Sequence, residues 1–151
     1  MRYYNDYDYE TIKAIKEGRL TKLIKSHRPN AKVNKYEIGE VHGIKEHGVL
    51  LDSLQTKKGT VRNYAYKIDY EGKETNYNWV KPFSLKDDSC RLFIKITGKE
   101  VMNYNEVPRE LIEAYGLEDF NRWYDQYEAN GRACYKSAKN PKVAILSFEV
   151  M

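Results

Sequence analysis

The chain has 151 residues, of which 41% are hydrophobic and 32% are charged, and its formal net charge is +4 at pH 7. This length suits a single domain over residues 1–151 with one hydrophobic core. The mild positive charge is compatible with a nucleic acid or nucleotide partner but is well below the basicity that would indicate one unaided. No apolar run approaches the roughly 18 residues that cross a membrane, so we expect no membrane contact.

Cysteine and histidine are too few and too scattered for a disulfide framework or a zinc site. Cys90 and Cys134 are far apart in the sequence, and we expect both to be reduced thiols in the cytoplasm. His27, His42 and His47 lack zinc-type spacing with them and are expected at the surface or in turns. The polar, tyrosine-rich N-terminus is unlike a signal peptide. No phosphate-binding glycine loop or nucleophile elbow is present, so we expect no metal and no cofactor.

A short helix and a basic segment come first. Tyr9, Ile12 and Ile15 lie near helical spacing, which predicts a helix over 9–17 that ends at Gly18. Residues 20–26 are expected to be extended and residues 30–36 to form a polar loop. The stretch over 17–29 also carries five basic side chains, Arg19, Lys22, Lys25, His27 and Arg28. A glycine turn before a basic, extended segment is suited to contact an anionic ligand.

Strands and turns dominate the middle of the chain. Residues 38–54 are mostly strand-like, with bends expected at the glycines. After a basic turn over 55–59, a strand is predicted over 60–70, with one face formed by Tyr64, Tyr66, Ile68 and Tyr70. A turn over 71–73 then leads into a predicted hairpin strand over 74–80, which Pro82 ends.

The last third alternates strand, helix and strand. Residues 91–97 predict a strand, and Pro108 suits the first turn of a helix over 109–115. A helix over 118–129 aligns four aromatic residues in one stripe that we interpret as core packing, namely Phe120, Trp123, Tyr124 and Tyr127. The apolar run over 142–150 predicts a central strand. This order predicts an α+β fold, with a strongly bent mixed sheet or small β-barrel and flanking helices.

Residues 15–28 resemble the signature of the ASCH domain, a small β-barrel fold similar to the PUA domain. In bacterial and bacteriophage members a helix ends in Gly-Arg-Lys-Thr-x-Thr-x-Arg, and these eight positions here read Gly18-Arg19-Leu20-Thr21-Lys22-Leu23-Ile24-Lys25. The likeness continues to the end of the chain and is closest to phage-type members. It runs in order through Tyr36 with Gly39–Glu46, Tyr66–Asp69, Trp79 with Lys81-Pro82, Ser89–Leu92, Glu113–Gly116, Asn140–Val143 and Ser147–Glu149.

The resemblance implies a PUA-like β-barrel with a role on nucleic acids or modified nucleosides. Some members hydrolyse an acylated cytidine and others are reported to cleave RNA. In the hydrolases the signature lysine, the second threonine and a glutamate of the late helix do the work. Those positions here are Leu20, Leu23 and Tyr115. Leucine moves no proton, and tyrosine is a poor base near neutral pH.

Three functions follow as hypotheses. The first is binding of RNA, a nucleotide or a modified nucleoside without catalysis, by Arg19, Thr21, Lys22, Lys25, Lys45, Trp79, Arg91 and Tyr115. The second is a hydrolase with displaced residues, for which Thr21, Lys22 and Glu113 are the weak candidates. The third is a phage-type protein that binds and inhibits a host defence protein. We rank binding first and leave open whether the protein is an enzyme. The expected location is the cytoplasm of a bacterial host.

Overall fold

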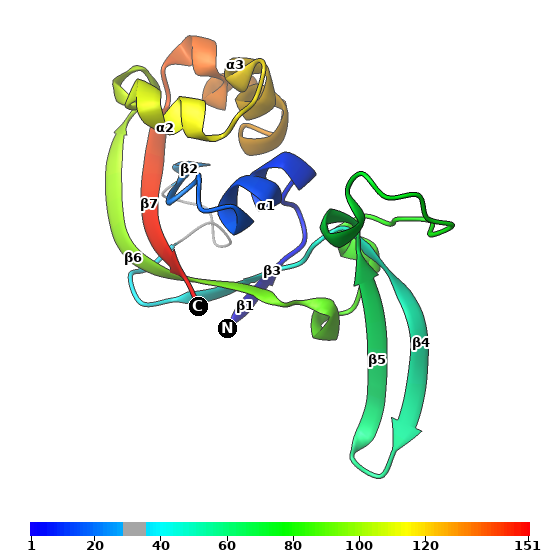
Figure 1. Cartoon of the computed structure of the whole chain (residues 1–151). Coiled ribbons are helices and arrows are strands. Elements are labelled where there is room, and N and C mark those ends of the chain that lie inside the picture. The colour runs from blue at the N-terminus through cyan, green and yellow to red at the C-terminus, as the bar shows by residue number, and fades with distance from the viewer. Residues whose placement is uncertain (29–35) are drawn as a thin grey trace.

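Five strands form a strongly curled sheet in the computed structural model (Figure 1), which describes residues 1–28 and 36–151. The predicted loop over 30–36 lies outside the described residues except for Tyr36. The strand order is β1-β3-β6-β7-β2, with β1 parallel to β3 and the other neighbours antiparallel. The strands are β1 (Arg2–Tyr4), β2 (Lys22–Ser26), β3 (Val41–Ile44), β6 (Leu92–Asn103) and β7 (Lys142–Val150). The predicted α+β class with a strongly bent mixed sheet is confirmed.

The longest strand, β6, bends the sheet. Its first part pairs with β3, and from Ile94 onward it pairs with β7, with a register shift between Ile96 and Gly98. A shift of this kind kinks a strand and increases its twist. The prediction ended this strand at residue 97, whereas it continues to Asn103. The prediction of a central β7 is confirmed, because β6 and β2 pair with its two edges.

Helix α1 (Tyr9–Lys16) lies in the hollow of the curled sheet (Figure 1). The side chain of Asp8 caps its N-terminus by accepting from the backbone N–H of Thr11 at 3.4 Å. Gly18, with a φ of +75°, ends the helical stretch as predicted. The helix buries Ile12 and Ile15 in the hydrophobic core that the sheet strands share.

Two further helices cover one end of the sheet, namely α2 (Arg109–Ala114) and α3 (Phe120–Trp123). The predicted helix over 118–129 is α-helical only in α3 and continues as a π-helical turn over Tyr124–Glu128. In that turn the backbone N–H of Ala129 donates to the carbonyl of Tyr124. The extra residue per turn rotates the aromatic stripe. Tyr127 is consequently 51% exposed, so its predicted core position is wrong.

A separate hairpin of β4 (Gly48–Thr56) and β5 (Gly59–Tyr66) projects from the body (Figure 1). The predicted strand over 38–54 is therefore divided between two sheets. The predicted strand over 60–70 ends at Tyr66, and a 3₁₀ helix over Lys67–Tyr70 takes Ile68 and Tyr70 off its face. The predicted strand over 74–80 is wrong, since only Val80 forms a bridge, with Gly48.

Short 3₁₀ helices connect the remaining elements, at Pro82–Ser84, Asp87–Ser89, Tyr104–Glu106, Ala133–Tyr135 and Ser137–Lys139. No helix in the described part of the chain is long and apolar enough to cross a membrane. His42 is fully buried in β3, so its predicted surface position is wrong. Its Nε2 lies 2.8 Å from Glu40 Oε2, and burial lowers the pKa of the imidazole.

Candidate functional site

A pocket of about 340 Å³ lies where the start of the chain meets β2 and the π-helical turn. Ligand pockets for small molecules begin at about this size. Strand β2 contributes Leu23 and Lys25, and the helical end contributes Trp123, Gln126, Tyr127, Glu128 and Asn130. The other lining residues are Asp6, Tyr7, Asp8, Thr11, Arg28, Tyr36 and Tyr115. We call this cavity the Lys25 pocket.

A buried ion pair forms the centre of the Lys25 pocket. Lys25 Nζ lies 3.2 Å from Glu128 Oε1, and the two side chains are 10% and 16% exposed. Burial disfavours the charged lysine, but Glu128 together with Tyr7, Tyr36 and Asp6 outweighs this effect and holds the pKa of Lys25 well above its ordinary value. The ammonium therefore stays charged at neutral pH.

Glu128 and Tyr115 also close the outer edge of the sheet. β2 is an edge strand, and its N–H groups at Ile24 and Ser26 find acceptors on side chains instead of on another strand. Ile24 donates to the hydroxyl of Tyr115 at 2.8 Å, and Ser26 donates to Glu128 Oε2 at 3.2 Å. Covering an edge in this way prevents pairing with another chain. It also holds Glu128 rigidly beside Lys25.

Two tyrosines face the lysine. Lys25 Nζ lies over the ring of Tyr7, 4.2 Å from its centroid. Burial raises the pKa of Tyr7, and burial raises that of Tyr36 to about 12, with Lys25 opposing both shifts. Both phenols are therefore neutral hydroxyls at physiological pH. The Tyr7 hydroxyl is buried and has no hydrogen-bond partner among residues 1–28 and 36–151.

Aromatic and amide side chains border the same pocket. The rings of Trp123 and Tyr127 lie 6.1 Å apart at 34°, and the Trp123 Nε1 donates to Asp8 Oδ1 at 3.2 Å. Gln126 and Asn130 add amide groups. The lining thus offers two neighbouring, tilted aromatic rings next to hydrogen-bonding groups of both kinds.

The formal charges of this lining nearly cancel. Lys25 and Arg28 are its cations, and Asp6, Asp8 and Glu128 are its carboxylates. Arg28 donates to the backbone carbonyl of Glu128 at 2.8 Å and lies over the ring of Tyr135. Such a lining suits a neutral polar ligand better than a phosphate, which requires an excess of positive charge.

The three positions that the ASCH resemblance matches to catalytic residues are all buried. Leu20, Leu23 and Tyr115 are each 1% exposed. Leu23 and Tyr115 line the Lys25 pocket, and burial raises the pKa of Tyr115 further above its already alkaline value. These three side chains pack in the core and offer no base at neutral pH.

Arg19, Thr21 and Lys22 line a second cavity, of about 330 Å³, between β2 and α2. Lys22 is exposed whereas Leu20 is buried, so these two side chains lie in different environments. The reason is that β2 begins at Lys22, after Leu20. Glu113 is exposed and paired with Arg109, and it is not among the residues that line this cavity.

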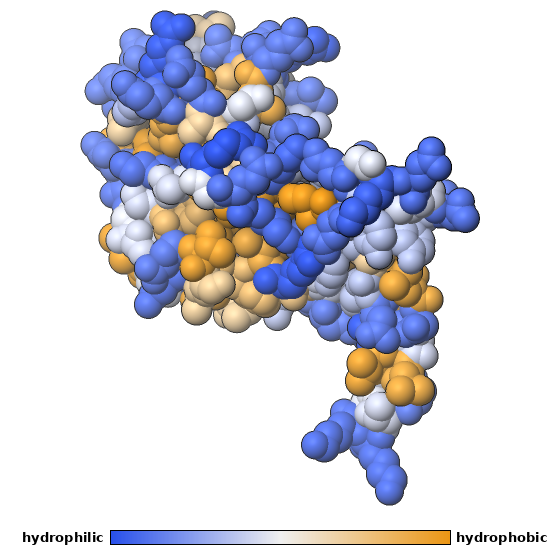
Figure 2. Space-filling model, in the orientation of Figure 1, coloured by the Kyte–Doolittle hydropathy of each residue, from blue (hydrophilic) through white to orange (hydrophobic). Residues whose placement is uncertain are grey.

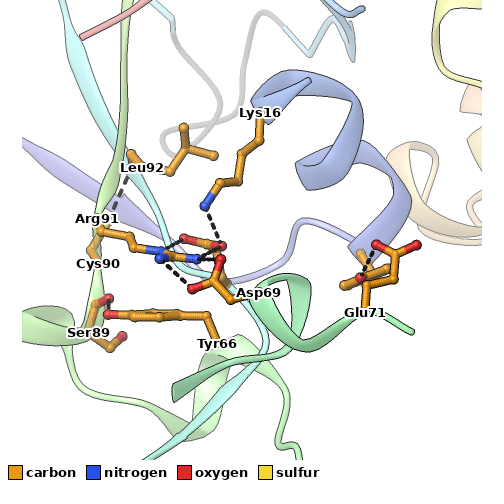
Figure 3. A network of polar contacts seen from close by, with 10 residues as sticks. Lys16, Tyr66, Asp69, Glu71, Ser89, Cys90, Arg91 and Leu92 are labelled. Atoms are coloured by element: carbon orange, nitrogen blue, oxygen red, sulfur yellow. Dashed lines mark hydrogen bonds and ion pairs between the residues drawn. The ribbon is translucent and has the colours of Figure 1, made fainter. Parts of the chain in front are cut away.

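The remaining predicted contacts lie at the base of the hairpin or beyond it. Arg91 is bound by Glu46 and Asp69, at 2.7 Å and 2.8 Å, and lies over the ring of Tyr66 (Figure 3). Lys16 pairs with Glu46 at 3.0 Å, so that α1 joins the same network.

Lys45 and Trp79 are apart from that network. The side chain of Lys45 is 7% exposed and is held by Asp87 and by the carbonyl of Leu85. Trp79 packs with Tyr70 and Tyr77. Of the eight predicted ligand contacts, the structure brings only Lys25 and Tyr115 to the Lys25 pocket.

Sequence reasoning missed Glu128 and Tyr7 as site residues. Both are remote from Lys25 in sequence, and Glu128 lies in a segment whose expected helical geometry is altered by the π-helical turn. A signal was present in the tyrosine content, which is 14 residues, but only the fold shows which rings surround a cation.

Comparison with known proteins gives one informative match. No protein-family model matches the chain, and no curated protein matches it significantly. The crystal structure of protein EF3133 from Enterococcus faecalis V583, described under the family model DUF984, is similar with a TM-score of 0.52. The two are 16% identical, and the match covers 99% of this chain and 75% of that one. This similarity concerns the fold, and the ASCH resemblance stays a prediction.

Proposed function

We propose that this protein binds a single nucleoside unit, either free or as an unpaired base of an RNA, in the Lys25 pocket, as a non-catalytic ASCH-like domain. The observation that carries the proposal is the pairing of an aromatic border, Trp123 and Tyr127, with a buried Lys25–Glu128 centre. Unpaired bases are typically bound by stacking on aromatic rings and by hydrogen bonds to their edges.

The charge of the pocket distinguishes binding of a single nucleoside from general binding of the RNA phosphate backbone. Cations and carboxylates nearly balance in the lining, so few counterions are released when a ligand enters. Backbone binding loses affinity steeply as salt increases. We therefore expect the affinity for a nucleoside to change less than about threefold between 50 mM and 200 mM salt.

The test is a calorimetric titration of the protein with nucleosides and with a short single-stranded oligoribonucleotide. Tyr127→Ala removes a half-exposed ring from the pocket border without opening the core. Stacking contributes roughly 1–3 kcal/mol per base, so the variant should bind about 5-fold to 150-fold more weakly.

Tyr77→Ala is the matched control. Tyr77 is 38% exposed and packs with Tyr70 and Trp79, outside the Lys25 pocket. It should leave the affinity unchanged. If no nucleoside or oligoribonucleotide binds at millimolar concentration, or if both variants bind equally, the proposal is wrong.

A further inference from the structure

The Lys25 ammonium has hydrogen-bonding capacity that the protein leaves unused. It carries three N–H donors, and one of them is directed to Glu128 Oε1. Apart from this bond, the ammonium contacts the face of the Tyr7 ring within residues 1–28 and 36–151. A buried cation with free donors is costly unless a ligand supplies an acceptor.

The Tyr7 hydroxyl, independently of Lys25, also has an unused hydrogen-bond donor. The residue is 5% exposed, and its oxygen has no partner in the described part of the chain. Buried hydroxyls are nearly always hydrogen-bonded. The Lys25 ammonium lies over the ring that carries this hydroxyl, so the two donor groups belong to the same wall of the Lys25 pocket.

An unpaired acceptor completes the set. The Asp6 carboxylate lines the same pocket, is exposed, and has no hydrogen bond or ion pair within residues 1–28 and 36–151. The pocket thus offers two groups with unused donors, Lys25 and Tyr7, and one carboxylate. Their complement is an oxygen acceptor next to an N–H donor, which is the arrangement of an oxo group and the adjacent ring N–H in a nucleobase.

On the basis of the proposed function, we infer that the Lys25 pocket selects nucleobases with an oxo group next to a ring N–H, and rejects the 6-amino edge of adenine. Lys25 and Tyr7 donate to the oxo oxygen, and Asp6 accepts from the N–H. Adenine presents an amino group to the two donors and a ring-nitrogen acceptor to the carboxylate, so each contact becomes a mismatch.

Inosine and adenosine test this selectivity directly, because they share the ribose and the purine ring and differ in the 6-oxo or 6-amino group. Calorimetric titration of the wild-type protein should give an affinity for inosine about 10-fold to 100-fold higher than for adenosine. Tyr7→Phe removes only a hydroxyl and should reduce this ratio severalfold. Lys25→Met should bring the ratio close to one.

Tyr77→Phe is the matched control, since it removes a hydroxyl from a ring outside the Lys25 pocket and should keep the ratio. Equal binding of inosine and adenosine by the wild-type protein would overturn this inference and leave the proposed function standing. Absence of binding by either nucleoside or any oligoribonucleotide would reject both. Should Lys25→Met fail to fold, Tyr7→Phe alone decides, and an unchanged ratio in that variant overturns the inference.

Discussion

Tyr115 is a buried tyrosine that joins two parts of the fold. Where the ASCH resemblance implies a working glutamate, the chain has a tyrosine that is buried and bonded to the backbone of β2. Its ring contacts Phe120 and Trp123, with centroids 5.2 Å and 5.1 Å away. The side chain therefore joins the helical end of the molecule to the sheet edge.

We expect Tyr115→Phe to be destabilising although the ring is retained. The change leaves the Ile24 N–H buried without an acceptor, which costs about 1–3 kcal/mol in the free energy of unfolding. Urea denaturation followed by circular dichroism measures this difference. Tyr127→Phe, at a 51% exposed ring, serves as control and should have no measurable effect. Equal stability of the two variants would show that the Tyr115 hydroxyl does not support β2.

At the scale of elements, the hairpin and the curled sheet are stabilised differently. The five-stranded sheet shares a core with α1, whereas β4 and β5, among residues 1–28 and 36–151, pair only with each other apart from the bridge at Gly48. The hairpin carries exposed apolar side chains at Leu50, Leu51, Leu54 and Val61, and Figure 2 shows apolar surface along it. Its base is held by polar contacts of Arg62 and Tyr64 with Asp88.

Matched leucine substitutions should reveal this difference. Leu54 is 63% exposed on the hairpin, and Leu146 is fully buried in β7. Leu54→Ala should change the free energy of unfolding by less than about 0.5 kcal/mol. Leu146→Ala should cost about 2–5 kcal/mol, because it removes buried apolar surface and leaves a cavity. Chemical denaturation of both variants checks this, and a large loss for Leu54→Ala would mean that the hairpin is buried against another surface in solution.

At the scale of the whole molecule, buried tyrosines link stability to alkaline pH. Burial raises the pKa of Tyr36 and of Tyr124 to about 12, from the ordinary value of 10.0, and it also raises the pKa of Tyr7 and Tyr115. Above pH 10 the unfolded chain loses phenolic protons that the folded protein retains. The folded state therefore becomes less stable as the pH rises from about 10 to 12.

The free energy of unfolding should be nearly constant between pH 7 and 9 with respect to these groups, and it should fall at pH 11. Tyr36 and Tyr124 should each contribute a loss of about 1.4 kcal/mol at that pH. Urea titrations at pH 8, 10 and 11 measure the change, and the phenolate absorbance near 295 nm reports ionisation. Full ionisation of all tyrosines at pH 11 in a protein that remains folded would contradict this prediction.

The sequence by itself determined the α+β class, helix α1 with its Gly18 end, the first half of strand β6 and the central position of β7. These features depend on local periodicity and on glycine and proline, which act over a few residues. The sequence predicted much less of the candidate site. Of the eight predicted ligand contacts, only Lys25 and Tyr115 lie together in the Lys25 pocket. Thr21 and Lys22 line a different cavity, and Arg91 is occupied by Glu46 and Asp69.

Tertiary structure alone decided the partners of Lys25, because Tyr7 and Glu128 reach it from distant parts of the chain. It also decided the separation of β4 from β3, which local alternation reads as one strand. The physical reason is the same in both cases. Burial and electrostatic pairing depend on which segments meet in space, and that information is absent from the spacing of residues along the chain.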